Sequence, residues 1–178
     1  MQDIEDRVIG VLLGLAAGDR IGGPIRMALH VAESLHECGG VDVSDIGLRY
    51  LDWWRNGAFD TGPTADQVLS LVNSGISFEQ AVILVDKKTH GMSAGCNPAH
   101  RSAPLAMHGA IEDAAAEQAA IMEARLTHGH PLAGETAAAV VYLCRSLIRG
   151  ASWTSALNVA TKDHQDEIRA ALASRSFQ

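Results

Sequence analysis

The chain has 178 residues, of which 47% are hydrophobic and 4% aromatic, and its formal net charge is −7. This length and apolar content exclude a disordered chain, and we expect one domain over residues 1–178 with a sizeable core. The acidic balance and the absence of a basic block argue against nucleic acid as a partner.

The cysteines and the first apolar run indicate the compartment. Cys38, Cys96 and Cys144 are odd in number and widely spaced, and they form no CxxC motif. This pattern argues against a disulfide framework or a zinc site and predicts an intracellular, cytoplasmic protein. The apolar run over 8–17 follows three acidic residues and is too short to cross a membrane, so we interpret it as an amphipathic helix.

The N-terminal half predicts four helices in succession, from apolar residues at helical spacing. Pro24 and Pro63 each suit the first turn of a helix, where no backbone N–H is needed. Gly39, Gly40 and Gly75 suit helix ends. The four ranges are about 4–17, 24–38, 44–56 and 63–74.

The C-terminal half continues the helical pattern after a long loop. Ser77-x-x-Gln80 is a possible capping box, Pro131 opens the longest helix, and Gly150 ends it. No segment alternates at the period of a strand, so the predicted fold class is all-α with about eight helices. The further ranges are about 77–87, a short helix after residue 98, 112–126, 131–149 and a last helix capped by Ser152.

Three loops carry residues that are unusual for simple connections. In 57–64, Asp60 between glycines can place a carboxylate in a cleft, or the segment is a helix–helix turn in which Asp60 or Thr61 is a cap. In 91–104, glycines and Arg101 can form an anion site, or His100 and Arg101 can make structural hydrogen bonds. In 123–131, His128 and His130 can bind a metal ion or act as acid–base groups, or they can serve as caps and make loop hydrogen bonds.

Taken in order, several segments resemble the ADP-ribosylglycohydrolase family. Residues 14–19 read GLAAGD and are similar to its opening segment, and 27–35 resemble the helix that follows its aspartate motif. Residues 50–64 resemble its Y-x-x-W and F-D-x-G-x-T stretch, and 95–106 resemble its phosphate loop. Residues 125–128, with the helix after them, resemble its T-H helix.

The resemblance implies an orthogonal multi-helix bundle, here truncated at the C-terminus, that removes ADP-ribose from modified side chains. The family uses two Mg²⁺ or Mn²⁺ ions held by a T-D-D-T and a D-x-D-T motif. Residues 22–25 read GGPI where the first motif is expected, and no D-x-D-T precedes Gln178. Hard divalent cations need several oxygen ligands, so we expect no metal cofactor.

The resemblance also assigns site residues. Asp60, Thr61 and Gly62 are expected to contact ribose or phosphate, with Asp19 nearby. The pyrophosphate loop is expected to consist of Gly95, Cys96, Asn97 and Arg101, although Pro98 contributes no N–H to it. His128 is expected close to the ligand.

Three hypotheses follow for the activity. The first is a metal-free glycohydrolase in which Asp60 and His128 or His130 are the catalytic acid–base groups. The second is a module that binds ADP-ribose or a related nucleotide without turnover, and the third is a homo-oligomeric helical scaffold. We expect a homodimer, because a shortened chain exposes an apolar face.

Overall fold

The computed structural model describes residues 2–109, 111–161, 166, 168 and 170. In this part of the chain there are ten α-helices and no strand, which confirms the all-α fold class. No helix among these residues is long and apolar enough to cross a membrane. The helices are α1 (Gln2–Gly18), α2 (Gly23–Cys38), α3 (Val43–Arg55), α4 (Pro63–Asn73), α5 (Phe78–Lys88), α6 (Asn97–Arg101), α7 (Ala103–Met107), α8 (Asp113–Ala124), α9 (Pro131–Ile148) and α10 (Trp153–Thr161).

The expected helix signals lie at the helix ends. Prolines occupy the first turns of α2, α4 and α9. The Ser77 side chain caps α5 by accepting a hydrogen bond from the backbone N–H of Gln80 at 3.3 Å. Gly39, with φ 68°, ends α2 in the left-handed conformation that glycine adopts without steric cost.

The single short helix expected after residue 98 is instead two helices, α6 and α7, divided at Ser102. Pro104 explains the division, because it has no N–H to bond to the carbonyl four residues earlier and its ring crowds that carbonyl. α6 contacts α2, α8 and α9, and α7 contacts these three helices and α1.

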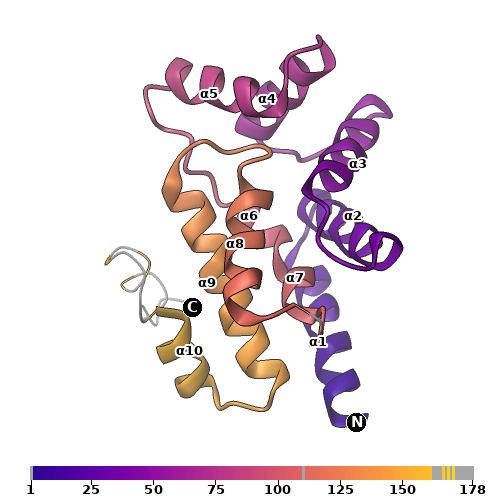
Figure 1. Cartoon of the computed structure of the whole chain (residues 1–178), viewed down its shortest axis with the longest axis vertical. Coiled ribbons are helices and arrows are strands. Elements are labelled where there is room, and N and C mark those ends of the chain that lie inside the picture. Colours follow the sequence, from indigo (N-terminus) through magenta and orange to yellow (C-terminus); the bar gives the residue numbers. More distant parts are fainter. Residues whose placement is uncertain (1, 110, 162–165, 167, 169, 171–178) are drawn as a thin grey trace.

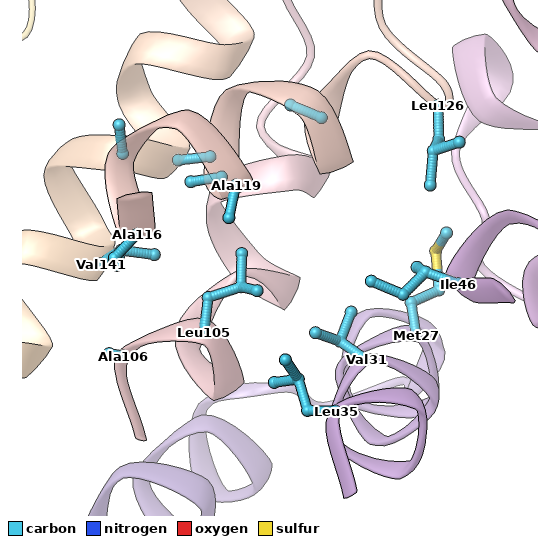
Figure 2. Packing of buried hydrophobic residues seen from close by; sticks show 14 of the residues in the cluster. Met27, Val31, Leu35, Ile46, Leu105, Ala106, Ala116, Ala119, Leu126 and Val141 are labelled. Atoms are coloured by element: carbon cyan, nitrogen blue, oxygen red, sulfur yellow. The ribbon is translucent and has the colours of Figure 1, made fainter. Parts of the chain in front are cut away.

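Alanine sets how closely the central helices pack. α8 and α9 lie side by side in the middle of the molecule, and α10 packs against α9 (Figure 1). Small buried residues such as Ala116, Ala120 and Ala138 line this contact. Figure 2 shows the larger side chains of α2, α3 and α7, among them Met27 and Leu105, filling the space beside them.

The α4–α5 pair lies at one end of the long axis (Figure 1). It has a small core of its own, made by Val68, Ala81, Val82 and Val85. The loop before α4 reaches back to the start of α2. It therefore meets the end of α1 and the start of α6, and these segments enclose the site described next.

Candidate functional site

A cavity of about 610 Å³ lies where the end of α1, the start of α2, the loop before α4 and the start of α6 meet. We call it the Asp60 cavity. Three separate stretches of the chain contribute to its wall, which mixes charged, polar and apolar side chains. The lining residues are Gly14, Leu15, Gly18, Asp19, Arg20, Ile21, Pro24, Asp60, Gly62, Cys96, Asn97 and His100.

Asp19 anchors the turn between α1 and α2. One carboxylate oxygen accepts hydrogen bonds from the backbone N–H groups of Gly22 at 2.8 Å and Ile21 at 3.3 Å, and the other accepts from Ile25 at 2.8 Å. Burial raises the pKa of Asp19, but these three N–H groups and the nearby His100 together hold it below its usual range. Asp19 therefore lines the cavity as an ionised carboxylate whose oxygens are hydrogen-bonded to the N-terminus of α2.

Asp60 is presented by a strained turn. Its φ is 52°, a left-handed conformation that is uncommon outside glycine, and Gly57 and Gly62 on either side also have positive φ. The backbone carbonyl of Asp60 lies so close to Gly23 that a Cβ there would be 2.4 Å from it. The exposed Asp60 side chain lines the cavity.

Asn97 connects two walls of the cavity. Its side-chain amide donates to the backbone carbonyl of Thr61 at 3.0 Å, and its amide oxygen accepts from Arg101 at 2.9 Å. The position of Thr61 is thus set by its backbone, and its buried side chain does not line the cavity. Asn97 and Gly62 do line it.

Arg101 lies inside the protein, with no exposed surface, and it does not line the cavity. Its guanidinium donates to Glu123 at 2.6 Å and to Thr127 at 2.8 Å, and it lies over the Tyr50 ring, 5.0 Å from the centroid. Tyr50 donates to the same Glu123 oxygen at 2.6 Å. Arg101 therefore makes structural hydrogen bonds inside the protein, which is one of the two roles that the sequence allows, and it does not form an anion site in the cavity.

Glu123 is the buried residue that sequence reasoning missed. It lies on α8 with no exposed surface, among alanines that suggested only helix packing. A signal was present, because Glu123 is three, four and seven residues after Ala120, Ala119 and Ala116 and shares their apolar face. A carboxylate on such a face requires a buried partner.

His128 lies behind the cavity wall, buried to 3% exposure, with Nδ1 2.8 Å from the Thr127 hydroxyl. A Cβ at Gly95 would be 2.7 Å from its Nε2 atom, so the loop backbone covers the imidazole. Burial, and then the positive charge of Arg101, lower the pKa of His128 to about 3. At neutral pH the ring is an uncharged packing group.

This burial makes stability depend on pH. Between about pH 3 and 6.5 the unfolded chain binds a proton at His128 and the folded chain does not, so stability rises with pH across that window. The contribution has a slope of up to about 1.4 kcal/mol per pH unit. We expect His128→Gln to flatten the pH dependence of urea unfolding between about pH 4.5 and 6.5. The exposed His90→Asn is the control, and an unchanged slope in His128→Gln would refute the assignment.

His130 caps α9 and lies apart from the Asp60 cavity. Its Nδ1 atom accepts a hydrogen bond from the backbone N–H of Leu132 at 3.2 Å. The backbone N–H of His130 donates to the Ser93 hydroxyl at 3.0 Å. It lines a smaller hollow with Arg125 and Pro131. Of the three side chains proposed as catalytic, only Asp60 lines the Asp60 cavity.

The N-cap residue of α6, Cys96, and a residue one helical turn later, His100, complete the wall. Cys96 and His100 are both exposed and both line the cavity. Cys96 is one of the site residues that the sequence predicts, whereas the sequence suggests only structural hydrogen bonds for His100. The i, i+4 spacing of the two residues was the signal that could have paired them.

In the described part of the chain, the residues of the Asp60 cavity do not fit a divalent metal centre. Both oxygens of Asp19 accept hydrogen bonds from backbone N–H groups. Asp60 is the other carboxylate that lines the cavity. The segment where the family places its first aspartates packs Gly23 against the Phe59 and Asp60 carbonyls. Within the described residues, no three His, Cys, Asp or Glu side chains are placed to hold a metal ion.

Comparison with known proteins gave two matches. The sequence model of the family described as ADP-ribosylglycohydrolase matches residues 1–176. A solved structure described as an ADP-ribosylglycohydrolase-related protein complex is similar, with a TM-score of 0.70 and 24% sequence identity. The match covers 97% of this chain and 68% of that chain, and it supports the fold. No match was found among curated proteins.

Proposed function

We propose that this chain, which belongs to the ADP-ribosylglycohydrolase family, binds an ADP-ribosyl group in the Asp60 cavity without a divalent cation. The observation that carries the proposal is the separation of the predicted catalytic groups. Asp60 lines the cavity, whereas His128 is buried behind Gly95 and His130 caps α9. A general acid and a general base must both reach the scissile bond. These three residues do not meet in the cavity, so the structure supports binding better than it supports hydrolysis catalysed by them.

The cavity suits a nucleotide-sized ligand in volume and in chemistry. Its volume of about 610 Å³ is within the usual range for small-molecule sites. Arg20 and His100 supply donors for phosphate oxygens, and the Asp60 carboxylate can accept hydrogen bonds from ribose hydroxyls. Ile21 and Pro24 offer an apolar surface to a base.

Calorimetric titration with ADP-ribose, in Mg²⁺ and in a chelator, tests this function. We expect binding that is equal in both conditions. Arg20→Ala should weaken it about tenfold, the loss of roughly one charge-assisted hydrogen bond. Arg26→Ala is the matched control, because Arg26 lies on α2 and does not line the cavity. Absence of binding, or binding only in Mg²⁺, would refute the proposal.

The homodimer remains a prediction. Its physical basis is an exposed apolar face of α1, where Ile9 and Leu13, 55% and 64% exposed, lie one helical turn apart. Such a face is a common association surface. A dimer through α1 is compatible with ligand binding.

A further inference from the structure

Cys96 and His100 lie one helical turn apart on the wall of the Asp60 cavity. The backbone N–H of His100 donates to the carbonyl of Cys96 at 3.3 Å, the i, i+4 bond of a helical turn. Residues at this spacing have Cβ atoms about 5–6 Å apart on one face of the helix. Both side chains are exposed, and both line the cavity.

Asp19 lines the same cavity as the His100 imidazole. His100 is among the groups that hold the pKa of Asp19 low, after burial, which acts in the opposite direction, and the three backbone N–H groups. The Asp19 carboxylate is itself fixed by those N–H groups. A thiol, an imidazole and a fixed carboxylate therefore line one cavity, and these are the groups by which a nucleophile is activated when the imidazole takes its proton.

We propose that Cys96 is a nucleophile of the cavity, that His100 is the base that takes its proton, and that its substrate class is an ADP-ribosyl N-glycoside. The choice of substrate class rests on the function proposed above. The thiol–imidazole pair does not, because it follows from the shared wall and the helical spacing alone. The pair offers a displacement that needs neither a metal ion nor the two distant histidines.

The step is a substitution at the anomeric carbon of the ribose. The Cys96 sulfur forms an S–C bond as the C–N bond breaks, and the bonding pair leaves with the nitrogen. His100 takes the thiol proton and returns it to a leaving amine. When the leaving group is nicotinamide, which departs neutral, the proton passes to water. No oxidant, reductant or metal enters the balance.

The other two cysteines provide internal references in every experiment. Cys38 is exposed on α2 and does not line the Asp60 cavity. Cys144 is half-buried, and burial raises the pKa of its thiol to about 11, so it should react slowly. The rate at Cys96 divided by the rate at Cys38 is independent of reagent concentration. Because the Cys38 thiol interacts with Asp45, which does not line the cavity, the change of this ratio in a His100 variant measures activation of Cys96.

The first test is alkylation of the folded protein with iodoacetamide, followed by peptide mass spectrometry. We expect Cys96 to react about tenfold faster than Cys38, and His100→Asn to remove most of that difference. His90→Asn is the matched control, since His90 is exposed and does not line the cavity. Free imidazole should restore part of the rate in His100→Ala. A rate ratio unaffected by His100→Asn would overturn the pair.

The second test separates the pair from the ligand. We expect ADP-ribose to protect Cys96 but not Cys38 from alkylation. Fast, His100-dependent alkylation without protection would retain the pair and refute the ADP-ribosyl ligand. Protection without dependence on His100 would retain the ligand and refute the pair.

The substrate class is tested with NAD⁺, an ADP-ribosyl N-glycoside. The wild-type chain should release a stoichiometric amount of nicotinamide as it gains the mass of one ADP-ribosyl group on Cys96, or release nicotinamide continuously if the bond to sulfur is then hydrolysed. Both signals should vanish in Cys96→Ser and fall in His100→Asn. If the wild-type chain gives neither signal, the proposed substrate class is wrong.

Discussion

Arg101→Met lowers the free energy of unfolding by about 3–5 kcal/mol, the usual cost of removing one partner from a buried ion pair. The pair is fully buried, with 2.6 Å between the Arg101 and Glu123 side chains. Among the described residues, none donates a hydrogen bond to the second Glu123 oxygen. Without Arg101, the Glu123 carboxylate would keep only the Tyr50 hydroxyl as a partner. Urea unfolding at pH 7 measures the effect.

The double variant Arg101→Met/Glu123→Met is the control for this explanation. It removes both charges, so it should recover most of the lost stability. Tyr50→Phe removes a single hydrogen bond from the carboxylate and should cost about 1–3 kcal/mol. If the double variant is less stable than Arg101→Met, the cost does not come from an unpaired carboxylate.

Gly23→Ala, which adds one methyl group, should disrupt the packing around the cavity strongly. The added Cβ would lie 2.4 Å from the Asp60 carbonyl oxygen and 2.7 Å from that of Phe59. Both contacts are to backbone, which a rotamer change cannot relieve, so the start of α2 and the loop must move apart. We expect a loss of about 3 kcal/mol in the free energy of unfolding. The same movement should weaken ADP-ribose binding, because Asp60 and Pro24 line the cavity from the two displaced segments.

Gly10→Ala is the matched substitution without a clash. Gly10 lies within α1, and a methyl group added there would have no neighbouring atom within 4 Å outside its own helix turn. Alanine should stabilise this helix by about 0.5–1 kcal/mol. Equal stability of the two variants would contradict the close approach of the loop to Gly23.

The two proposals place different demands on the same cavity. Binding of an ADP-ribosyl group needs hydrogen-bond donors such as Arg20 and a cavity of complementary shape. It does not need the Cys96 thiol. Bond breaking needs Cys96 and His100. Cys96→Ser should therefore retain ADP-ribose affinity while losing any reaction with NAD⁺, and Arg20→Ala should weaken both.

The sequence by itself determined the helices and where most of them begin and end. Pro24, Pro63 and Ser77 act through local backbone geometry, which depends only on neighbouring residues. The ordered motifs also predicted the family, which the match over residues 1–176 confirmed. The helices and the family can therefore be predicted without knowing which helices contact one another.

The tertiary structure decided which polar residues meet. Arg101 and Glu123 are 22 residues apart, and nothing local to either shows that they pair inside the core. His128 and Asp60 belong to similar loop segments, yet one is covered by Gly95 and the other lines the cavity. Burial and partnership depend on helix packing across the whole chain, and that packing determines which side chains face a ligand.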